Sequence, residues 1–269
     1  MYKTKKIATL ASIALLSSSL SGVAMSNTMG GVVNVAIIGE ADTLDPMMSS
    51  KDVVGTVTQH IYETLFTFDS SWAPAPLLAD GMPDVSSDGL TYTIKIRQGV
   101  NFHDGSSMDS ADVVDSLNRW LSVASRGKSI ASKVDSVSAL DSHTVEIKLN
   151  SVYSALLSLM SMNNAAAVIY PQENIKGDDL AAPIGTGPYK VGEYKADQYL
   201  QLVRYDGYSS SKAPIDGAAG SRAGYLDEIN FIPVGDGSTR LEGLLSGQFD
   251  FAESIAAESY ARLESSSKA

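Results

Sequence analysis

The clearest structural pattern in the chain is the stretch SDGLTYTIKIRQGVNFHDG, residues 87–105. It contains two turn sequences, Asp88-Gly89 and Asp104-Gly105, and between them Thr91–Arg97 alternates between polar and apolar residues. Successive side chains of a strand point to opposite faces, so this alternation predicts a strand with one face in a core and the other in water. The residues expected on the buried face are Tyr92, Ile94 and Ile96.

A second alternating segment, Val145–Leu149, is expected to pair with the first in one half-exposed antiparallel sheet. The chain between them predicts a helix over about Ser110–Val123. Asp109 is its expected N-cap, because an Asp side chain accepts hydrogen bonds from the free N–H groups of a first turn. Asp112 lies favourably near the positive end of the helix dipole. The expected buried stripe is Val113, Leu117, Trp120 and Leu121.

The remaining chain mixes strand and helix patterns, which indicates the α/β class. Val32–Ile38 is an almost entirely apolar run, so we expect a strand buried on both faces. Val53–Phe66 is expected to form a helix, and another helix is expected to begin at a Ser238 cap and stop at Gly247. Further strands are expected near Tyr189–Tyr194, Tyr199–Arg204, Ile229–Val234 and Phe249–Phe251.

Residues 1–24 have the three parts of a secretory signal peptide. Lysines near the start precede the apolar segment Ile7–Leu20, and the small residues Gly22-Val23-Ala24 form a cleavage pattern. The apolar run is too short for a membrane span, although an uncleaved N-terminal anchor is the alternative. Because the chain has no cysteine to carry a lipid, we expect a free periplasmic protein and not a lipoprotein.

The composition excludes several classes of function. A formal net charge of −11 argues against binding to nucleic acid or to anionic membranes, which needs a basic face. The lack of cysteine excludes disulfides, thiolate metal sites and cysteine nucleophiles. His60, His103 and His143 are far apart in the sequence, and no hydrolase, zinc-protease or nucleotide-binding motif is present. We therefore expect no catalytic residues, no metal and no cofactor. A secreted hydrolase is the least favoured alternative and would need a Ser or carboxylate pair buried together in a cleft.

Residues 87–105, continued by Ser110–Arg119, closely resemble the signature of the family 5 extracytoplasmic solute-binding proteins. These are receptors of ATP-binding-cassette (ABC) importers for peptides, dipeptides, opines and nickel. Other segments resemble the family in order and spacing: Thr43–Pro46, Ile61–Leu65, Gly185–Tyr189, Leu226–Ile229 and Ser246–Asp250. The resemblance covers residues 32–255.

The resemblance implies lobe one of a periplasmic binding protein, in which a mixed sheet with helices carries an inserted α+β subdomain. The implied divisions are 25–60 for the first part of the main subdomain, 61–181 for the insertion, and 182–269 for the second part with the start of the crossing to lobe two. Family members are much longer, so we expect the second lobe to be largely missing. We accordingly expect weak ligand binding by the 269-residue chain, and an exposed apolar surface that promotes association. A full-length protein is expected to be monomeric.

The resemblance also implies which residues face the ligand cleft. They are Ser49, Ser50, Lys51 and Asp52 in one segment and Ala252, Glu253 and Ser254 in another. The charges of Lys51, Asp52 and Glu253 suit both charged ends of a zwitterion, and the alternative is that they are solvated loop charges.

The implied function is reversible capture of a small solute by hinge closure and its delivery to an inner-membrane ABC permease. A peptide is the preferred ligand. Nickel chelate, opine, sugar oligomer and haem are alternative ligands, and a chemoreceptor partner or chaperone is an alternative role on the same scaffold.

Overall fold

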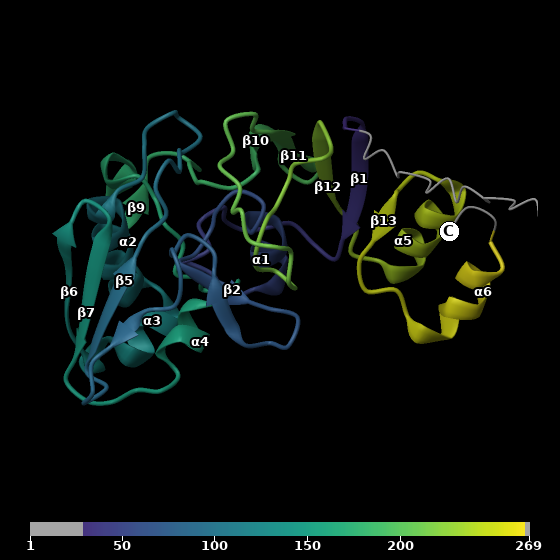
Figure 1. Cartoon of the computed structure of the whole chain (residues 1–269). Helices are drawn as coiled ribbons and strands as arrows, with labels where there is room; N and C mark the ends of the chain where they lie inside the picture. Colours follow the sequence, from purple (N-terminus) through teal and green to yellow (C-terminus); the bar gives the residue numbers. More distant parts are fainter. Residues whose placement is uncertain (1–28, 267–269) are drawn as a thin grey trace, which may run out of the picture.

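The computed structural model describes residues 29–266, which form two main β-sheets with helices packed against them (Figure 1). The smaller sheet lies at the left of the view, the larger sheet in the centre and the C-terminal helices at the right. The expected signal peptide, residues 1–24, lies outside the described residues. Within residues 29–266 no helix is both long enough and apolar enough to cross a membrane.

The smaller sheet is antiparallel, with the strand order β4-β5-β7-β6. Its strands are β4 (Asp84–Val85), β5 (Thr91–Lys95), β6 (Val134–Asp141) and β7 (Thr144–Leu149). Strands β5 and β7 pair as predicted, with Tyr92 opposite Ile147 and Ile94 opposite Val145. These four side chains are buried, whereas Lys95 is exposed, so the predicted half-exposed sheet is confirmed.

Helix α2 (Ser110–Val123) has the predicted bounds and packs on β6 and β7. The Asp109 carboxylate accepts a hydrogen bond from the Ala111 N–H at 2.7 Å, and the Asp112 carboxylate accepts one from the Asp109 N–H at 2.9 Å. This reciprocal capping box confirms the predicted start of the helix. The buried stripe contains Val113, Leu117 and Trp120, with Leu121 partly buried.

The larger sheet has the order β10-β11-β12-β1-β13. Its strands are β1 (Val32–Ile37), β10 (Tyr189–Lys195), β11 (Tyr199–Arg204), β12 (Glu228–Pro233) and β13 (Phe251–Ala252). Strand β1 runs parallel to both β12 and β13. The expectation that β1 is buried on both faces is wrong at its start, where Val32 is 50 % exposed. Because β13 pairs only with Val35 and Ala36, the first half of β1 forms an edge.

Helix α1 (Asp52–Thr58) ends well before the predicted end at Phe66. The prediction fails because the carbonyl groups after Thr58 accept hydrogen bonds from distant residues and not from the N–H four residues further on. The carbonyl–donor pairs are His60 with Tyr189, Ile61 with Gly187, and Glu63 with Ile169. The expected apolar stripe is nevertheless buried, at Val54, Val57, Ile61 and Leu65.

The turn at Gly185–Tyr189 packs directly on the backbone that follows α1. A Cβ atom at Gly185 would collide with the Ile61 carbonyl, and one at Gly187 would collide with the His60 carbonyl. The two glycines therefore serve a close approach of two backbone segments.

Helix α5 (Gly237–Ser246) begins at Asp236, not at the predicted cap Ser238. The Asp236 carboxylate accepts a hydrogen bond from the Thr239 N–H at 2.7 Å, and an Asp two residues before the serine satisfies the first turn equally well. The helix ends as predicted at Gly247, whose φ of 80° is left-handed.

The remaining elements are short. They are β2 (Phe66–Phe68), β3 (Pro74–Pro76), α3 (Ser125–Ile130), α4 (Leu156–Met160), β8 (Ile175–Lys176), β9 (Asp179–Leu180) and α6 (Tyr260–Glu264). One cluster of buried apolar side chains joins both main sheets. The larger sheet takes its strands from the two ends of the described chain and the smaller sheet from the middle. This separation supports our proposal that residues 61–181 are an inserted subdomain within 25–60 and 182–269.

Candidate functional site

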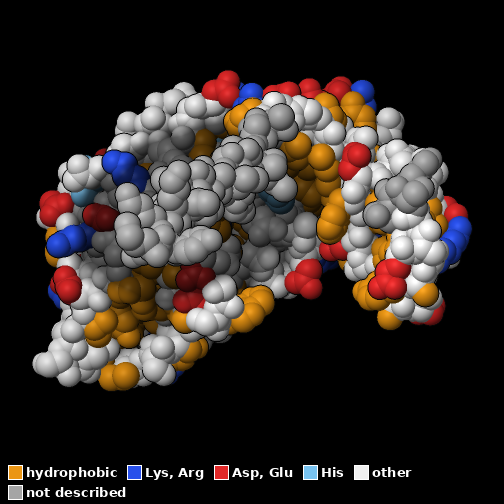
Figure 2. Space-filling model, turned by 45° about the vertical axis from the view of Figure 1, so that its right-hand side comes forward, with side chains coloured by type: hydrophobic (Ala, Val, Ile, Leu, Met, Phe, Trp, Pro, Cys, Tyr) orange, Lys and Arg blue, Asp and Glu red, His pale blue; other side chains and the backbone are white. Residues whose placement is uncertain are grey.

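The candidate site lies at the edge of the larger sheet where parallel strands β1, β12 and β13 end. The chain leaving β1 leads to Ser49–Asp52, and the chain leaving β13 continues into Glu253 and Ser254. Loops at the carboxyl ends of parallel strands form the usual ligand crevice of open α/β sheets. Figure 2 shows the surface hollowed between the central part and the C-terminal part, with hydrophobic side chains gathered above the hollow.

The segment after β13 is tied to the segment after β1. The Glu253 N–H donates to the Ala36 carbonyl at 2.9 Å, and the Glu253 carboxylate accepts the Ile38 N–H at 3.1 Å. This second bond joins residues 215 positions apart in the sequence. Ser254 follows in a left-handed conformation with φ of 53°, which costs a non-glycine residue backbone energy.

Arg240 on α5 holds this turn in place and was not singled out by the sequence. Its guanidinium donates to the carbonyls of Glu253 at 2.8 Å and Ser254 at 3.1 Å, and also to those of Val234 and Gly235. Arg240 is only 5 % exposed, and its guanidinium N–H groups donate to backbone carbonyls and not to a carboxylate. The sequence of α5 gives no sign that the partners of its arginine are carbonyls, so only the fold reveals this role.

The segment Ser49–Asp52 lies against residues 163–165. The Ser49 carbonyl accepts the Ala165 N–H at 3.0 Å, and the Asp52 carboxylate accepts the Asn164 side-chain amide at 3.0 Å. Lys51 forms an exposed ion pair with Asp42 at 2.6 Å. The expected charges of this segment are thus present at the surface, and Asn164 joins them without having been predicted.

The loop before Ser49 is anchored by a buried ion pair between Asp45 and Arg119 of α2. The Asp45 carboxylate also accepts the Tyr170 hydroxyl at 2.7 Å and the Met47 N–H at 3.0 Å. The Asp45 and Arg119 side chains are only 12 % and 2 % exposed. The Leu44-Asp45-Pro46 segment and the end of the Ser110–Arg119 segment, which are separate in the sequence, therefore meet in one network.

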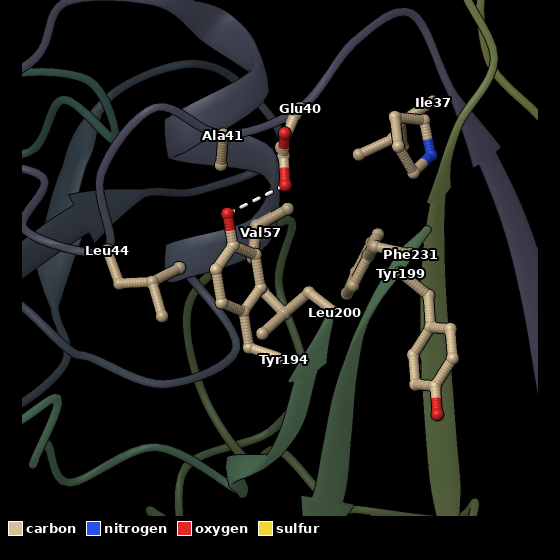
Figure 3. A pocket seen from close by; sticks show the side chains of 10 residues that line it. Ile37, Glu40, Ala41, Leu44, Val57, Tyr194, Tyr199, Leu200 and Phe231 are labelled. Atoms are coloured by element: carbon tan, nitrogen blue, oxygen red, sulfur yellow. Dashed lines mark hydrogen bonds between the residues drawn. The ribbon is translucent and has the colours of Figure 1, made fainter. Parts of the chain in front are cut away.

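A second contact fixes the start of the same loop over the larger sheet (Figure 3). The Glu40 carboxylate accepts the Tyr194 hydroxyl at 2.7 Å and the Asp197 N–H at 3.1 Å. The pair spans a small apolar pocket whose walls include Ile37, Leu44, Val57, Leu200 and Phe231. The pocket lies where the loop after β1, helix α1 and the larger sheet pack against one another through apolar side chains.

The Tyr194 hydrogen bond is the main cause that lowers the pKa of Glu40, followed by the Asp197 N–H. Replacing Tyr194 by phenylalanine is expected to raise the pKa of Glu40 toward its ordinary value. Because the folded-state pKa is lowered, this contact stabilises the fold above the ordinary glutamate pKa, and the contribution is lost as pH falls through the folded-state value. The check is an NMR titration of the Glu40 carboxyl in both proteins. An unchanged titration midpoint would contradict the assignment of the contact.

The three histidines lie on different parts of the fold. His60 packs edge-on against Tyr189 and Phe231, and burial lowers its pKa. His103 is hydrogen-bonded to the Gly187 carbonyl at 2.9 Å, and His143 lies beside Ser142 in the turn before β7. In the described part of the chain no three His, Asp or Glu side chains are arranged to hold a metal ion.

An α/β lobe with loops gathered at the carboxyl edge of its parallel strands is the architecture expected of an extracytoplasmic solute-binding protein. The chain belongs to one family of that class, because the model described as "Bacterial extracellular solute-binding proteins, family 5 Middle" matches residues 73–269.

Curated relatives include the glutathione-binding proteins GsiB of two bacteria. The protein of Pectobacterium atrosepticum is 32 % identical over 238 residues, which cover 87 % of this chain and 44 % of the relative. That of Salmonella paratyphi A is 33 % identical over 235 residues, covering 86 % and 44 %. The chain therefore spans less than half the length of these relatives.

Solved structures show the same fold. The periplasmic binding protein DppA of Helicobacter pylori, in complex with the peptide STSA, has a TM-score of 0.76 and 25 % identity over 88 % of this chain and 49 % of its own. The binding protein AgaA of A. tumefaciens, in complex with agropinic acid, has a TM-score of 0.74 and 27 % identity over 88 % and 46 %.

Proposed function

We propose that this chain carries the first-lobe half of the ligand site of a periplasmic ABC-importer receptor. In this role the protein captures a short peptide, delivers it to an inner-membrane permease, and makes or breaks no bond. The main support is that the chain leaving β1 leads to Ser49–Asp52 and the chain leaving β13 leads to Ala252–Ser254, where Glu253 bonds to Ala36 and Ile38 at the end of β1. Membership of family 5 supports the transport role.

A short peptide, including the γ-linked tripeptide glutathione, is the ligand class that we propose. Lys51 carries an exposed positive charge suited to a terminal carboxylate, and its pairing with Asp42 at the surface is weak enough to be exchanged. Asp52 offers a carboxylate to a terminal amine. The glutathione-binding relatives and the peptide-bound neighbour point to the same class.

The experiment is an amide NMR titration of the purified chain with glutathione and, separately, with trialanine. One wall of a two-lobed cleft gives weak binding, with a Kd on the order of 1 mM, about 4 kcal/mol of binding free energy. The expected shifts cluster at residues 49–54, 164–165 and 252–254. Shifts that are absent, or that cluster elsewhere, would overturn the proposed site.

A matched pair of variants tests the role of the positive charge. Lys51→Gln is expected to weaken binding of the peptides severalfold, whereas Lys128→Gln removes an exposed lysine from α3 and is expected to leave binding unchanged. Both proteins should keep their stability, because exposed charges contribute about 0–1 kcal/mol. Equal effects of the two substitutions would show that Lys51 only adds to the overall charge.

A further inference from the structure

A cavity of about 290 Å³ lies at the end of α1 opposite to Asp52, beneath the β2–β3 hairpin. Its lining divides into two parts. One part is apolar and aromatic, with Phe68, Trp72, Leu77, Met162 and Val168. The other part is polar and contains Thr58, Gln59, Glu63, Asn163 and Arg222. An amphipathic hollow with few polar groups is the usual form of a small-molecule site.

Arg222 is the accessible charge of this cavity. Its Nη2 donates to the Ala218 carbonyl at 2.7 Å and its Nε to the same oxygen at 3.3 Å. Its Nη1 is within ion-pair distance of the Glu63 carboxyl, at 3.9 Å, but donates no hydrogen bond to an acceptor within residues 29–266. A guanidinium edge with free donors is suited to a carboxylate.

Glu63 does not compete for a ligand, because it is fully buried and its oxygens are already occupied. One oxygen accepts the Tyr208 hydroxyl at 2.8 Å and the other accepts the Thr186 hydroxyl at 3.0 Å. Burial is the main cause that raises the pKa of this carboxyl, against the opposing effect of Arg222.

Trp72 lies at the rim of the cavity, with an exposed side chain and an unfavourable backbone conformation. It is 80 % exposed, and its φ of 62° is left-handed, a backbone state that favours glycine. Its ring lies 5.9 Å from that of Phe68. A large aromatic side chain held exposed at a strained turn position points to a surface that it covers or binds.

We propose that this cavity is a second binding site, separate from the peptide site, for a small carboxylic acid with an aromatic or aliphatic body. The carboxylate is held by Nη1 of Arg222, and the apolar body lies between Phe68, Trp72 and Met162. The ligand needs no second lobe, because every group that contacts it belongs to the described chain.

The chain provides its own optical probe for this site. It has two tryptophans: Trp72 at the rim, and Trp120, which is 1 % exposed and hydrogen-bonded to the Ala165 carbonyl. Titration with 3-phenylpropionate is expected to give a saturable change in the fluorescence of Trp72. The neutral 3-phenylpropionamide is expected to bind about tenfold more weakly, since it loses the charge-assisted hydrogen bonds. Trp72→Phe should abolish the optical signal while calorimetry still detects binding of the acid.

Two substitutions of arginine form the matched test. Arg222→Gln is expected to weaken binding of 3-phenylpropionate about tenfold, and Arg222→Lys to weaken it less. Arg262→Gln, which removes an arginine paired with Glu242 on the C-terminal helices, is expected to have no effect. Circular dichroism and thermal melting verify that each variant is folded, and Arg222→Lys keeps the test valid if Arg222→Gln does not fold. Equal binding of acid and amide, or unchanged binding by a folded Arg222 variant, would overturn the proposal.

Discussion

Replacing Arg119 by methionine is expected to lower the free energy of unfolding by about 3–5 kcal/mol, because the substitution leaves the Asp45 carboxylate charged and unpaired in the interior. The Arg119 side chain is 2 % exposed and that of Asp45 is 12 % exposed, so little water can replace the guanidinium. The Tyr170 hydroxyl and the Met47 N–H still donate to Asp45, at 2.7 Å and 3.0 Å, but two neutral donors do not balance a buried charge. The measurement is urea denaturation followed by circular dichroism.

The control is Arg262→Met on the surface, where the expected change is about 0.5 kcal/mol or less. A double-mutant cycle with Asp45→Leu separates the pair from other packing effects. The double variant is expected to be less destabilised than the sum of the two single variants by about 0.5–3 kcal/mol, because the apolar pair no longer buries a lone charge. Additive effects, or a loss of less than about 1 kcal/mol for Arg119→Met, would show that the two side chains are not coupled.

The same pair has a consequence for the candidate ligand site. Asp45 lies in the middle of the loop that leads to Ser49–Asp52, and the Arg119 pair ties this loop to helix α2. In Arg119→Met we therefore expect faster amide hydrogen exchange in residues 45–52 than in the smaller sheet.

Replacing Arg240 by methionine is expected to release the end of β13 from the larger sheet. Four backbone carbonyls in partly buried hydrogen bonds lose their charged donor, and a hydrogen bond to a charged group contributes about 1.5–3 kcal/mol. We expect local opening to become about 100-fold more frequent, equivalent to about 2.7 kcal/mol. The measurement is hydrogen exchange at the amides of Asp250 and Glu253, which donate to the carbonyls of Asn34 and Ala36.

The internal reference for this experiment is the β5–β7 pair of the smaller sheet, where exchange is expected to stay unchanged. Arg240→Lys should give an intermediate effect, because an ammonium group cannot reach the same set of carbonyls as a planar guanidinium. If the amides of β13 kept their protection in Arg240→Met, the turn at Glu253 and Ser254 would be held by the sheet alone.

Local patterns predicted well those parts of the fold that short-range interactions determine. The β5 alternation, the Asp109 cap and the bounds of α2 all follow from residues within a few positions of one another, and the pairing of β5 with β7 was predicted from the same alternation in both segments. The predicted helix at Val53–Phe66 failed for the opposite reason. Its second half has the apolar spacing of a helix, but distant N–H groups take the carbonyls that a helix would use.

The candidate site likewise contains residues that were expected from the sequence and residues that only the structure revealed. The resemblance identified Ser49–Asp52 and Ala252–Ser254 as the residues to examine, and whether they bind a ligand stays a prediction. Neither Asn164 beside Asp52 nor the Arg222 cavity was expected. Asn164 is 112 positions from Asp52, and the cavity brings Arg222 close to Glu63 from a distant part of the sequence.

The sequence by itself determined the family, the alternating sheet, the capped helix and the lack of any cysteine chemistry, because these are properties of residue types and of their spacing. Only the tertiary structure decided which charges are paired and where the backbone hydrogen bonds lead. Arg119 forms an ion pair with Asp45, and Arg240 donates hydrogen bonds to four carbonyls. Neither set of partners can be predicted from the spacing of residues along the sequence. A buried polar group must be satisfied by whatever the packed chain brings to it, and that depends on the whole fold.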